Sequence, residues 1–266
     1  MIALGVNTVL FKGHDVSVAL EHAALAGYDG VELSAIGGMC EHLEPARWAE
    51  QVASIRELAG RHGLALLSIE AASRDPERLE QVFAAAAALA IPVVNIGPGG
   101  KSEVPGDFEA QADHTDALCR MAAAHGVTLC VKAHVGQSVY NTPTTLALMQ
   151  RLDNAAFGVD MDPSHIFRAG EDPAVSLREV LSRVRHVHIR DCKQGGRGPG
   201  APRDQACGRG DIDLFAYCRA MVEGGYDGPV CLEVIGAGDC PLVERQAIAS
   251  ESYGFLNACL KALGAR

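Results

Sequence analysis

The sequence predicts one (β/α)8 barrel, an α/β fold in which residues 1–266 form a single domain. Short apolar runs recur at fairly regular intervals, and the stretches between them show helical periodicity. Strands that alternate with helices indicate a parallel sheet, and a count of eight favours a closed barrel over an open, doubly wound sheet. The predicted strands lie at about 2–7, 30–34, 64–70, 91–96, 127–134, 157–162, 184–190 and 229–235.

The predicted helices lie between these strands, and particular residues define their faces and ends. Apolar side chains share one face of two segments, at Val16, Leu20 and Ala23 and at Leu79, Val82, Phe83 and Ala86. An N-cap residue followed by proline at the first helical position is predicted at Asp75-Pro76, Thr142-Pro143 and Asp172-Pro173. Glycines mark the ends of other helices, just before strands, at Gly27, Gly63, Gly126 and Gly225.

The bulk composition argues against several classes of protein. Hydrophobic residues make up 48% of the chain, which is typical of a globular protein. The net charge of -10 argues against a nucleic-acid partner, because phosphate backbones attract cationic surfaces. We expect neither a signal peptide nor a membrane span, since the segment Met1–Asn7 lacks basic residues and no apolar run approaches about 20 residues. The nine cysteines contain no C-x-x-C pair, which argues against a zinc ribbon and favours free thiols in a reducing cytoplasm.

Polar and ionisable residues stand at the end of nearly every predicted strand. Burying an unpaired charge is costly, so a purely structural barrel strand has no use for so many of them. Active sites of α/β barrels lie where the strands end. We expect some of these residues to be solvated strand ends and the others to form a polar pocket. They are Asn7, Glu32, Glu70, Asn95, Lys132, His134, Asp160, Asp162, His186, His188, Arg190 and Glu233.

Asp162, His188 and Glu233 form the strongest constellation, since they end three consecutive strands. Two carboxylates and an imidazole at adjacent strand ends can coordinate a divalent metal. Two of them have structural alternatives: Asp162 could cap a helix that begins at Pro163, and His188 could be a core histidine with a backbone partner. Three such residues at corresponding points favour a site, so we expect their side chains to converge at one mouth of the barrel.

Five motifs are distributed along the chain: Gly27-Tyr28-Asp29-Gly30-Val31-Glu32, Asp162-Pro163-Ser164-His165, His186-Val187-His188-Ile189-Arg190-Asp191, Gly208-Arg209-Gly210-Asp211-Ile212-Asp213, and Gly225-Tyr226-Asp227-Gly228 leading to Glu233. With them the chain resembles, over essentially its whole length, the xylose-isomerase-like TIM-barrel superfamily, often called the sugar phosphate isomerase/epimerase family. The motifs are specific for the superfamily but not for one reaction, because its members include epimerases, isomerases, dehydratases and a DNA-repair endonuclease.

The resemblance implies one divalent metal ion, such as Mn, Mg, Co or Zn. Family members commonly hold it through a glutamate, an aspartate, a histidine and a glutamate on four consecutive strands, and the last three map onto Asp162, His188 and Glu233. Where the first glutamate is usual, this chain has Lys132, and His134 matches the histidine that often follows two residues later. A protonated lysine cannot coordinate a metal, because it has no lone pair.

Lys132 leaves three interpretations open. In the first, a metal binds through the three predicted ligands, with His134 or His165 completing the shell, and Lys132 contacts substrate or acts as an acid or base. In the second, the Lys132 ammonium replaces the metal and pairs with Asp162 and Glu233. In the third, a neutral Lys132 forms a Schiff base with a ketone.

We expect a sugar isomerase or epimerase that removes a proton next to a carbonyl in a small sugar, keto sugar or polyol, as the resemblance implies. That step needs a base and an electrophile that stabilises the enediolate. Glu233 is the expected base, with His134, His165 or Lys132 as the opposing acid. The residues expected to bind this small carbohydrate are Asn7, Glu70, Asn95, Arg190 and Arg209.

Other functions stay open at this point. Elimination of water begins with the same proton removal, so a dehydratase of a keto sugar or keto polyol is the first alternative. Lys132 also makes a non-catalytic sugar-binding subunit conceivable. An abasic-site endonuclease would need more histidines and a basic face, and the acidic balance argues against it. The oligomeric state is left open, with a homo-oligomer allowed.

The segment from Lys193 to Gly210 is rich in glycine and arginine and follows the seventh predicted strand. We expect it to form an enlarged, mobile loop that orders over the pocket on substrate binding, so that Arg197, Arg203 and Arg209 meet substrate oxygens. Barrels often bind phosphate after their last strands, so a phosphorylated substrate is also open.

Overall fold

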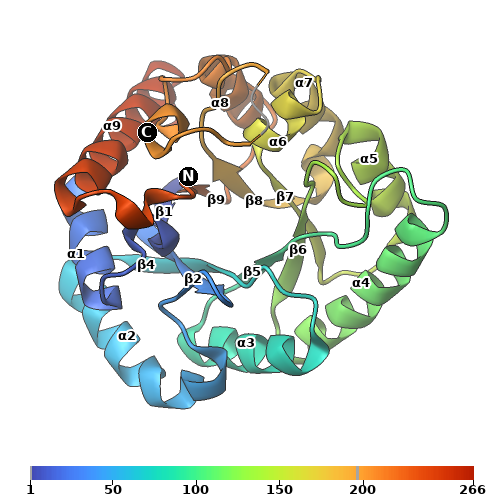
Figure 1. Ribbon diagram of the computed structural model, residues 1–266, viewed down its shortest axis with the longest axis horizontal. Coiled ribbons are helices and arrows are strands. Elements are labelled where there is room, and N and C mark those ends of the chain that lie inside the picture. The colour runs from blue at the N-terminus through green and yellow to red at the C-terminus, as the bar shows by residue number, and fades with distance from the viewer. Residues whose placement is uncertain (1, 196–197) are drawn as a thin grey trace.

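The computed structural model describes residues 2–195 and 198–266 and contains a closed barrel of parallel strands (Figure 1). The barrel strands are β1 (Ala3–Asn7), β2 (Gly30–Ile36), β4 (Ala65–Glu70), β5 (Val93–Ile96), β6 (Thr128–Lys132), β7 (Phe157–Met161), β8 (Val184–Ile189) and β9 (Pro229–Leu232). Neighbours in this order pair with each other, and β9 pairs with β1, which closes the sheet. The predicted (β/α)8 fold is confirmed.

Helices surround the barrel in a ring (Figure 1). They are α1 (Val16–Ala26), α2 (Trp48–His62), α3 (Pro76–Leu89), α4 (Asp107–Ala124), α5 (Thr142–Arg151), α6 (Pro163–Arg168), α7 (Pro173–Val180), α8 (Leu214–Glu223) and α9 (Leu242–Ala262). Short 3-10 helices lie in the connections, at η1 (Thr8–Phe11), η2 (Pro45–Arg47), η3 (Leu181–Arg183), η4 (Pro202–Gln205) and η5 (Ala237–Asp239). Among the described residues, none of these helices has the length and apolar character that a membrane crossing needs.

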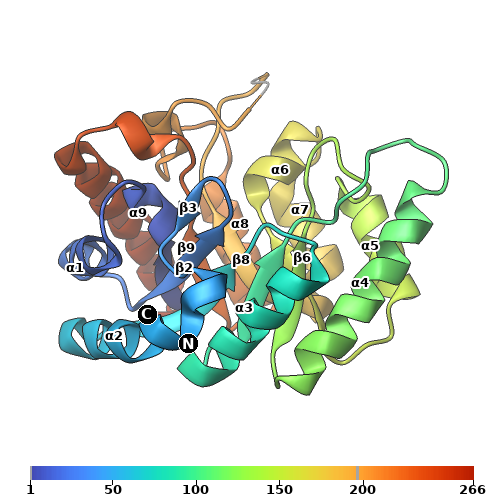
Figure 2. The same ribbon diagram turned by 60° about the horizontal axis from the view of Figure 1, so that its bottom comes forward.

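One element was not predicted from the sequence. The two-residue strand β3 (Cys40–Glu41) folds back on β2 and pairs with Ala35 and Ile36 in antiparallel register (Figure 2). It is too short to produce an apolar run. The turn that joins β2 to β3 places Met39 at the wall of the cavity described below.

The N-terminal caps are confirmed for two of the three predicted helices. Asp75 accepts a hydrogen bond from the Arg78 backbone N–H, and Asp172 accepts one from Ala174. The predicted cap at Thr142 is wrong by one residue. Asn141 caps α5 through a reciprocal pair of bonds with Thr144, because an amide followed three residues later by a threonine hydroxyl completes a capping box.

The predicted helix faces are buried. Leu79, Val82 and Phe83 on α3 are 0% exposed, as is Leu20 on α1. These apolar stripes pack outside the barrel strands and leave the interior of the barrel for other residues. Because the strands are parallel, all their carboxyl ends face the same mouth, so their terminal side chains meet there.

Two glycines of the barrel strands, Gly5 and Gly158, pack directly against cysteine side chains. A Cβ at Gly158 would lie 2.7 Å from Cys130 Sγ, and a Cβ at Gly5 would lie 2.7 Å from Cys231 Sγ. Real Cβ atoms do not approach so closely, so only glycine fits opposite each cysteine.

Candidate active site

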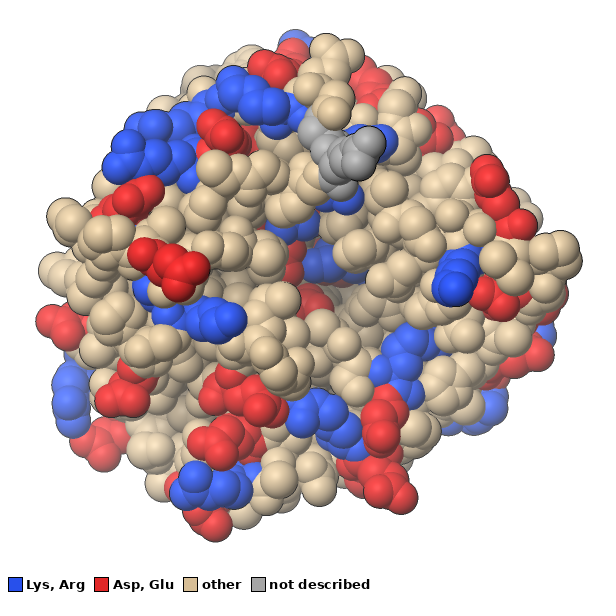
Figure 3. All heavy atoms as spheres, in the orientation of Figure 1, with Lys and Arg blue, Asp and Glu red and all other residues tan. Residues whose placement is uncertain are grey.

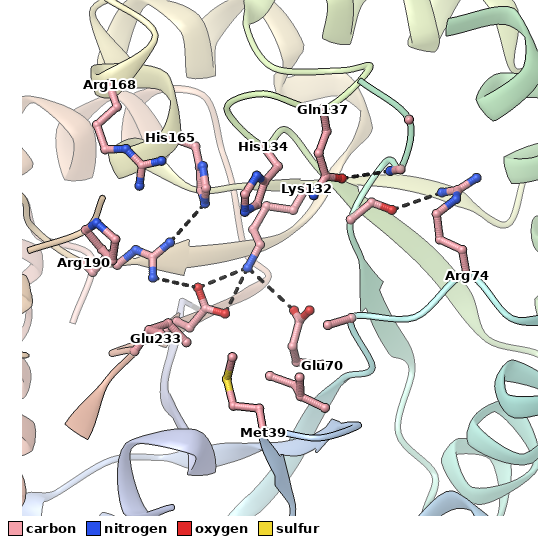
Figure 4. A pocket seen from close by; sticks show the side chains of 17 residues that line it. Met39, Glu70, Arg74, Lys132, His134, Gln137, His165, Arg168, Arg190 and Glu233 are labelled. Carbon is pink, nitrogen blue, oxygen red and sulfur yellow. Dashed lines mark hydrogen bonds and ion pairs between the residues drawn. The ribbon is translucent and has the colours of Figure 1, made fainter. Parts of the chain in front are cut away.

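A cavity of about 530 Å3 opens at the mouth where the barrel strands end. Figure 3 shows a hollow near the centre of this face, with Lys or Arg atoms and Asp or Glu atoms at its bottom. Its floor carries four charged or ionisable side chains from different strand ends, which we call the floor group: Glu70, Lys132, Arg190 and Glu233. Figure 4 shows the floor group converging on the same space.

Lys132, the last residue of β6, has its ammonium at the centre of the floor group (Figure 4). Its Nζ atom lies 3.0 and 3.1 Å from the two Glu233 oxygens and 3.8 Å from Glu70 Oε2. Burial by itself would lower the pKa of the ammonium, but the charges of Glu233 and Glu70 raise it above the ordinary value. Lys132 therefore stays cationic, which disfavours a Schiff base.

Glu233 follows β9 and is held by two cations. Besides the Lys132 bonds, Arg190 Nη1 lies 3.2 Å from Glu233 Oε2. Burial would raise the pKa of this carboxyl, but the charge of Lys132, with those of His188 and Arg190, holds the pKa far below its ordinary value. A carboxylate stabilised this strongly is a weak proton acceptor, so the geometry disfavours Glu233 as the base and supports it as a counter-ion.

Asp162 caps a helix, the structural alternative noted for it, and it also binds the arginine of the floor group. Its Oδ1 atom accepts a hydrogen bond from the Ser164 backbone N–H at 2.8 Å, which caps α6. Its Oδ2 atom accepts one from Arg190 Nη2 at 2.8 Å, and Arg190 Nε donates to Ser164 Oγ at 2.8 Å. Asp162 thus fixes the guanidinium that holds Glu233.

His134 and His165 stack against each other on one wall of the cavity, with ring centroids 4.2 Å apart. His134 Nδ1 lies 3.0 Å from the Val135 carbonyl oxygen, to which it can only donate, so the other ring nitrogen is left as an acceptor. Burial, together with the Lys132 charge, lowers the pKa of His134. His134 is therefore a neutral imidazole with a lone pair available at the cavity wall.

His165 is more deeply buried than His134. Its Nδ1 atom accepts from the Val135 backbone N–H at 3.3 Å, and its Nε2 atom lies 3.1 Å from Arg190 Nη2. Burial holds the pKa of this imidazole well below its ordinary value despite the nearby Asp162. A neutral imidazole has one acceptor nitrogen, so His165 accepts from only one of these donors and remains uncharged.

Glu70, the last residue of β4, faces Lys132 across the floor (Figure 4). Its side chain is buried, and among the described residues its Oε2 atom has no hydrogen-bond partner. Burial raises the pKa of Glu70 to about 8, although Lys132 and His188 act in the opposite direction. Glu70 is thus mostly protonated at neutral pH, whereas Glu233 across the ammonium is ionised.

Beneath the cavity lies a second set of ionisable side chains, which we call the sealed layer: Glu32, Asp160, His186 and His188. All four are 0% exposed. Asp160 lies 2.9 Å from His186 Nδ1 and 2.6 Å from His188 Nδ1, and His188 Nε2 lies 2.5 Å from Glu32. Burial would lower the pKa of His188, but Asp160 and Glu32 raise it well above its ordinary value. Both ring nitrogens of His188 therefore carry protons that face carboxylates.

Asn7 and Asn95, which were predicted to bind substrate, belong to this buried region. Their amide groups donate to Glu32 at 2.7 and 2.6 Å, and both residues are 0% exposed. Neither is among the residues that line the cavity. The structure therefore places them as supports of the sealed layer.

The loop after β8 meets the cavity through Pro199. Arg209 and Arg203 point away from it, because they form exposed ion pairs with Glu251 and Glu244. The prediction for Arg197 lies outside the described residues. Arg209, expected to bind substrate, is thus placed at the surface.

Three further polar residues line the cavity and had not been selected from the sequence: Arg74, Gln137 and Arg168 (Figure 4). Arg168 lies three positions after His165 on α6, so the Asp162–His165 motif offered an indirect signal for it. Arg74 and Gln137 lie in irregular connections, where sequence periodicity carries no information about side-chain direction.

Metal-ligand groups are present in the described part of the chain. Ligand atoms lie within 4.8 Å of one another in two sets of three residues, Glu32 with His186 and His188, and Glu70 with Asp160 and His188. The predicted set of Asp162, His188 and Glu233 is not brought together in this way, because Arg190 and Lys132 engage its two carboxylates.

A divalent ion does not fit these groups in their present arrangement. Both ring nitrogens of His188, which both groups need, are already engaged by carboxylates, Nδ1 at 2.6 Å from Asp160 and Nε2 at 2.5 Å from Glu32. Lys132 Nζ also lies 3.2 Å from His188 Nδ1 and 3.8 Å from Glu70, so a charged ammonium borders the second group. Like charges at this range repel, so the ammonium opposes a divalent cation at this position.

The comparison with protein families decides the family. The model of the family described as xylose isomerase-like TIM barrel matches residues 20–259. The chain belongs to this family. The resemblance drawn from the motifs is therefore confirmed.

Curated relatives of this xylose isomerase-like chain match only in part. An inosose dehydratase of Bacillus anthracis (strain CDC 684 / NRRL 3495) is 31% identical over 88 residues, which are 33% of this chain and 30% of that protein. An inosose dehydratase of Mesomycoplasma hyopneumoniae (strain 7448) is 26% identical over the same length. The chain thus spans about a third of the length of the curated relatives it matches.

Solved structures share the fold over nearly the whole chain. A probable 3-DHS dehydratase, AsbF, from Bacillus anthracis superposes with a TM-score of 0.77 at 16% identity, over 96% of this chain and 99% of that one. A D-tagatose 3-epimerase-like protein gives 0.78 at 17% identity, over 99% and 98% of the two chains. The IOLI protein, described with a binding zinc atom, gives 0.79 at 18%, over 98% and 99%.

Proposed function

We propose that this protein is an enzyme that dehydrates a small keto sugar or keto polyol. It would remove a proton from the carbon next to the carbonyl and expel a hydroxyl group from the adjacent carbon as water. The observation that carries this proposal is the Lys132 ammonium at the centre of the cavity floor, between an ionised Glu233 and a protonated Glu70. The partial match to inosose dehydratases supports the choice of elimination.

Lys132 supplies the electrophile in this proposal. Proton removal next to a carbonyl builds negative charge on the carbonyl oxygen, and a buried cation that faces this oxygen stabilises the enolate. Glu233 and Arg190 hold the ammonium in place, so little reorganisation is needed when the charge develops. In relatives with a fourth carboxylate ligand, a metal would stabilise the enolate. In this protein the Lys132 ammonium would do so.

His134 is the proposed base. Its Nδ1 proton is directed at the Val135 carbonyl, which leaves the Nε2 lone pair available to accept the substrate proton. The lowered pKa keeps the imidazole unprotonated near neutral pH. After the transfer, the positive charge that forms on His134 is balanced by the negative charge of the enolate beside Lys132.

Glu70 is the proposed acid, and with it the proton balance closes. The electron pair of the enolate reforms the carbonyl, forms a carbon–carbon double bond and breaks the adjacent carbon–oxygen bond. The leaving hydroxyl takes the Glu70 proton and departs as water. His134 then releases the proton it took from the substrate to solvent. Glu70 takes up a proton from solvent and is restored as the acid. A carboxyl with a pKa of about 8 is suited to this role.

Epimerisation is the second candidate, as the sequence first suggested. It is supported by the two carboxyl groups in opposite protonation states on either side of Lys132, since inversion needs an acid and a base on opposite faces. The strongly stabilised Glu233 makes it the weaker choice, because the carboxylate would have to accept a proton in every cycle.

The two reactions are separated by one experiment with chelator-treated protein. Inosose, 3-DHS and D-tagatose are incubated with it in deuterium oxide, and products are followed by mass spectrometry and proton NMR. We expect loss of water from a keto polyol. Exchange of the proton next to the carbonyl without loss of water would indicate the epimerase. Binding without exchange or loss of water in all three compounds would contradict both and support a non-catalytic subunit.

A further inference from the structure

Arg168, at the end of α6, lines the upper wall of the cavity, and its side chain points into it (Figure 4). The other cations near the floor are matched: Lys132 by Glu233, and Arg190 by Asp162 and Glu233. Arg168 is half-buried, yet within residues 2–195 and 198–266 it makes neither a hydrogen bond nor an ion pair.

The acidic residues next to Arg168 in the chain are already engaged. Glu171 accepts two hydrogen bonds from Thr142, through the backbone N–H and the hydroxyl, both at 2.8 Å. Asp172 accepts from the backbone of Ala174 as the cap of α7. A half-buried guanidinium with five N–H donors and no acceptor is costly, so the missing acceptor is expected from a ligand.

Asp162 acts on Arg168 through its charge, but it is already bound by Arg190 at 2.8 Å. Along the same wall lie His165, His134 and Gln137, in that order (Figure 4). Gln137 uses its Oε1 atom to accept from the Gly99 N–H at 2.9 Å, which leaves its amide N–H donors to face a ligand. The wall above the floor group therefore offers the Gln137 amide donors and the Arg168 guanidinium, which makes no ion pair within the described residues.

We propose that the substrate is an anion whose carboxylate group binds the Arg168 guanidinium. This rests on the proposed function, because it names the class of keto polyol that the enzyme takes: a polyhydroxylated keto acid. The planar guanidinium matches a carboxylate through two parallel hydrogen bonds. With the carboxylate at Arg168, the polyol portion extends along the histidine wall toward Lys132 on the floor.

The test compares three ligands with related carbon skeletons: gluconate, sorbitol and sorbitol 6-phosphate. Their affinities for the wild type, Arg168→Met, Arg168→Lys and the surface control Arg203→Met are measured by calorimetry. We expect gluconate to bind the wild type about 10- to 100-fold more tightly than sorbitol. Arg168→Met should remove that difference and leave sorbitol binding unchanged, Arg168→Lys should keep part of it, and Arg203→Met should keep all of it.

Several outcomes would overturn the proposal. Equal affinity for gluconate and sorbitol, no gluconate binding at all, or a gluconate preference that survives in Arg168→Met would each do so. If sorbitol 6-phosphate bound more tightly than gluconate, the proposed substrate would be a phosphorylated sugar instead of a keto acid. If neutral inosose is turned over and its kcat/KM falls in Arg168→Met, Arg168 contacts the polyol portion, which would reject the carboxylate site while leaving the proposed dehydration intact.

Discussion

The floor group and the sealed layer are both built from ionisable side chains of opposite charge, yet their surroundings differ. In the sealed layer Glu32, Asp160 and the two histidines are fully buried and contact one another at 2.5 to 2.9 Å. In the floor group every member lines the cavity, and Glu70 keeps an oxygen without a hydrogen-bond partner in the described part of the chain.

This difference indicates a division of labour between the two layers. A fully buried ionic network whose opposite charges pair with one another holds the strand ends at fixed positions, and breaking it costs stability. Groups that keep free lone pairs or protons next to a cavity are available for a ligand instead. We therefore expect substitutions in the floor group to reduce activity more than stability, and substitutions in the sealed layer to do the opposite.

The largest effect is expected for Lys132→Met, which keeps the apolar stem and removes the ammonium. Without the cation that faces the developing enolate, kcat should fall about 10³-fold. The measurement is kcat for water loss, with thermal unfolding of the same sample as a check on folding. Unchanged turnover in a folded Lys132→Met protein would show that the lysine is a bystander.

Lys132→Glu tests whether the Lys132 ammonium replaces a metal, because it places a carboxylate where relatives would have a metal ligand. Calorimetric titration with manganese should show binding to Lys132→Glu and much weaker binding to the wild type. Wild-type protein that binds one equivalent of manganese tightly, and loses its turnover on chelation, would contradict the proposal that the ammonium replaces the metal.

The second effect concerns the sealed layer and is measured as stability. Asp160→Asn removes the charge that faces both His186 and His188, and leaving the buried His188 cation without this partner costs about 3 to 5 kcal/mol. Chemical denaturation should show this loss. Asp153→Asn, whose exposed carboxylate lies 3.7 Å from Arg183, is the surface control and should cost about 1 kcal/mol or less. Equal losses in the two variants would contradict the contrast between the layers.

The third effect distinguishes the two stacked histidines. His134→Gln removes the proposed base and should lower kcat about 100-fold with little change in KM. As the pH is lowered, wild-type activity should be lost only below pH 6.5, the ordinary pKa of a histidine. Burial lowers the pKa of His134, and protonation blocks the base. His165→Gln should reduce activity less, since His165 acts through Arg190. A larger loss in His165→Gln would reverse the roles.

The barrel and its mouth could be predicted from the sequence because both depend on periodic patterns. Alternating apolar runs place the strands, and parallel strands bring their terminal residues together, which is why Lys132, Arg190 and Glu233 were expected at one site. The same logic failed for Asn7 and Asn95. They also end strands, but a residue one layer deeper in the barrel contacts other side chains instead of the cavity.

The partners of each charge could not be predicted, because they depend on distances across the barrel. Asp162 and Glu233 both looked like metal ligands, and only the structure shows that Arg190 lies between them. The protonation of Glu70 was equally hidden, since it results from burial beside other carboxylates. Arg209 looked available because its loop is rich in glycine, but Glu251 on α9 binds it at the surface.

The smallest effect concerns Glu70, the protonated acid of the floor group, and it is measured both as stability and as activity. The pKa of Glu70 is raised from an ordinary value of 4.5 to about 8 in the folded protein, so the folded state holds this proton more tightly than the unfolded state. The resulting stability is fully present below pH 4.5 and is lost as the pH rises to about 8. Wild-type protein should therefore lose part of its stability between pH 5 and about 8.5.

Glu70→Gln cannot ionise and should lose less stability over the same range, so its melting temperature relative to wild type should rise by several degrees toward alkaline pH. Glu179→Gln, an exposed residue on α7, is the matched control and should follow the wild type. Activity gives an independent readout: wild-type kcat should fall above about pH 8 as the acid ionises, and Glu70→Gln should be slow at every pH. If wild type and Glu70→Gln lost stability in parallel, Glu70 would already be ionised at neutral pH. The proton for the departing hydroxyl would then have to come from another group at the cavity, and His134 on the wall is the titratable candidate.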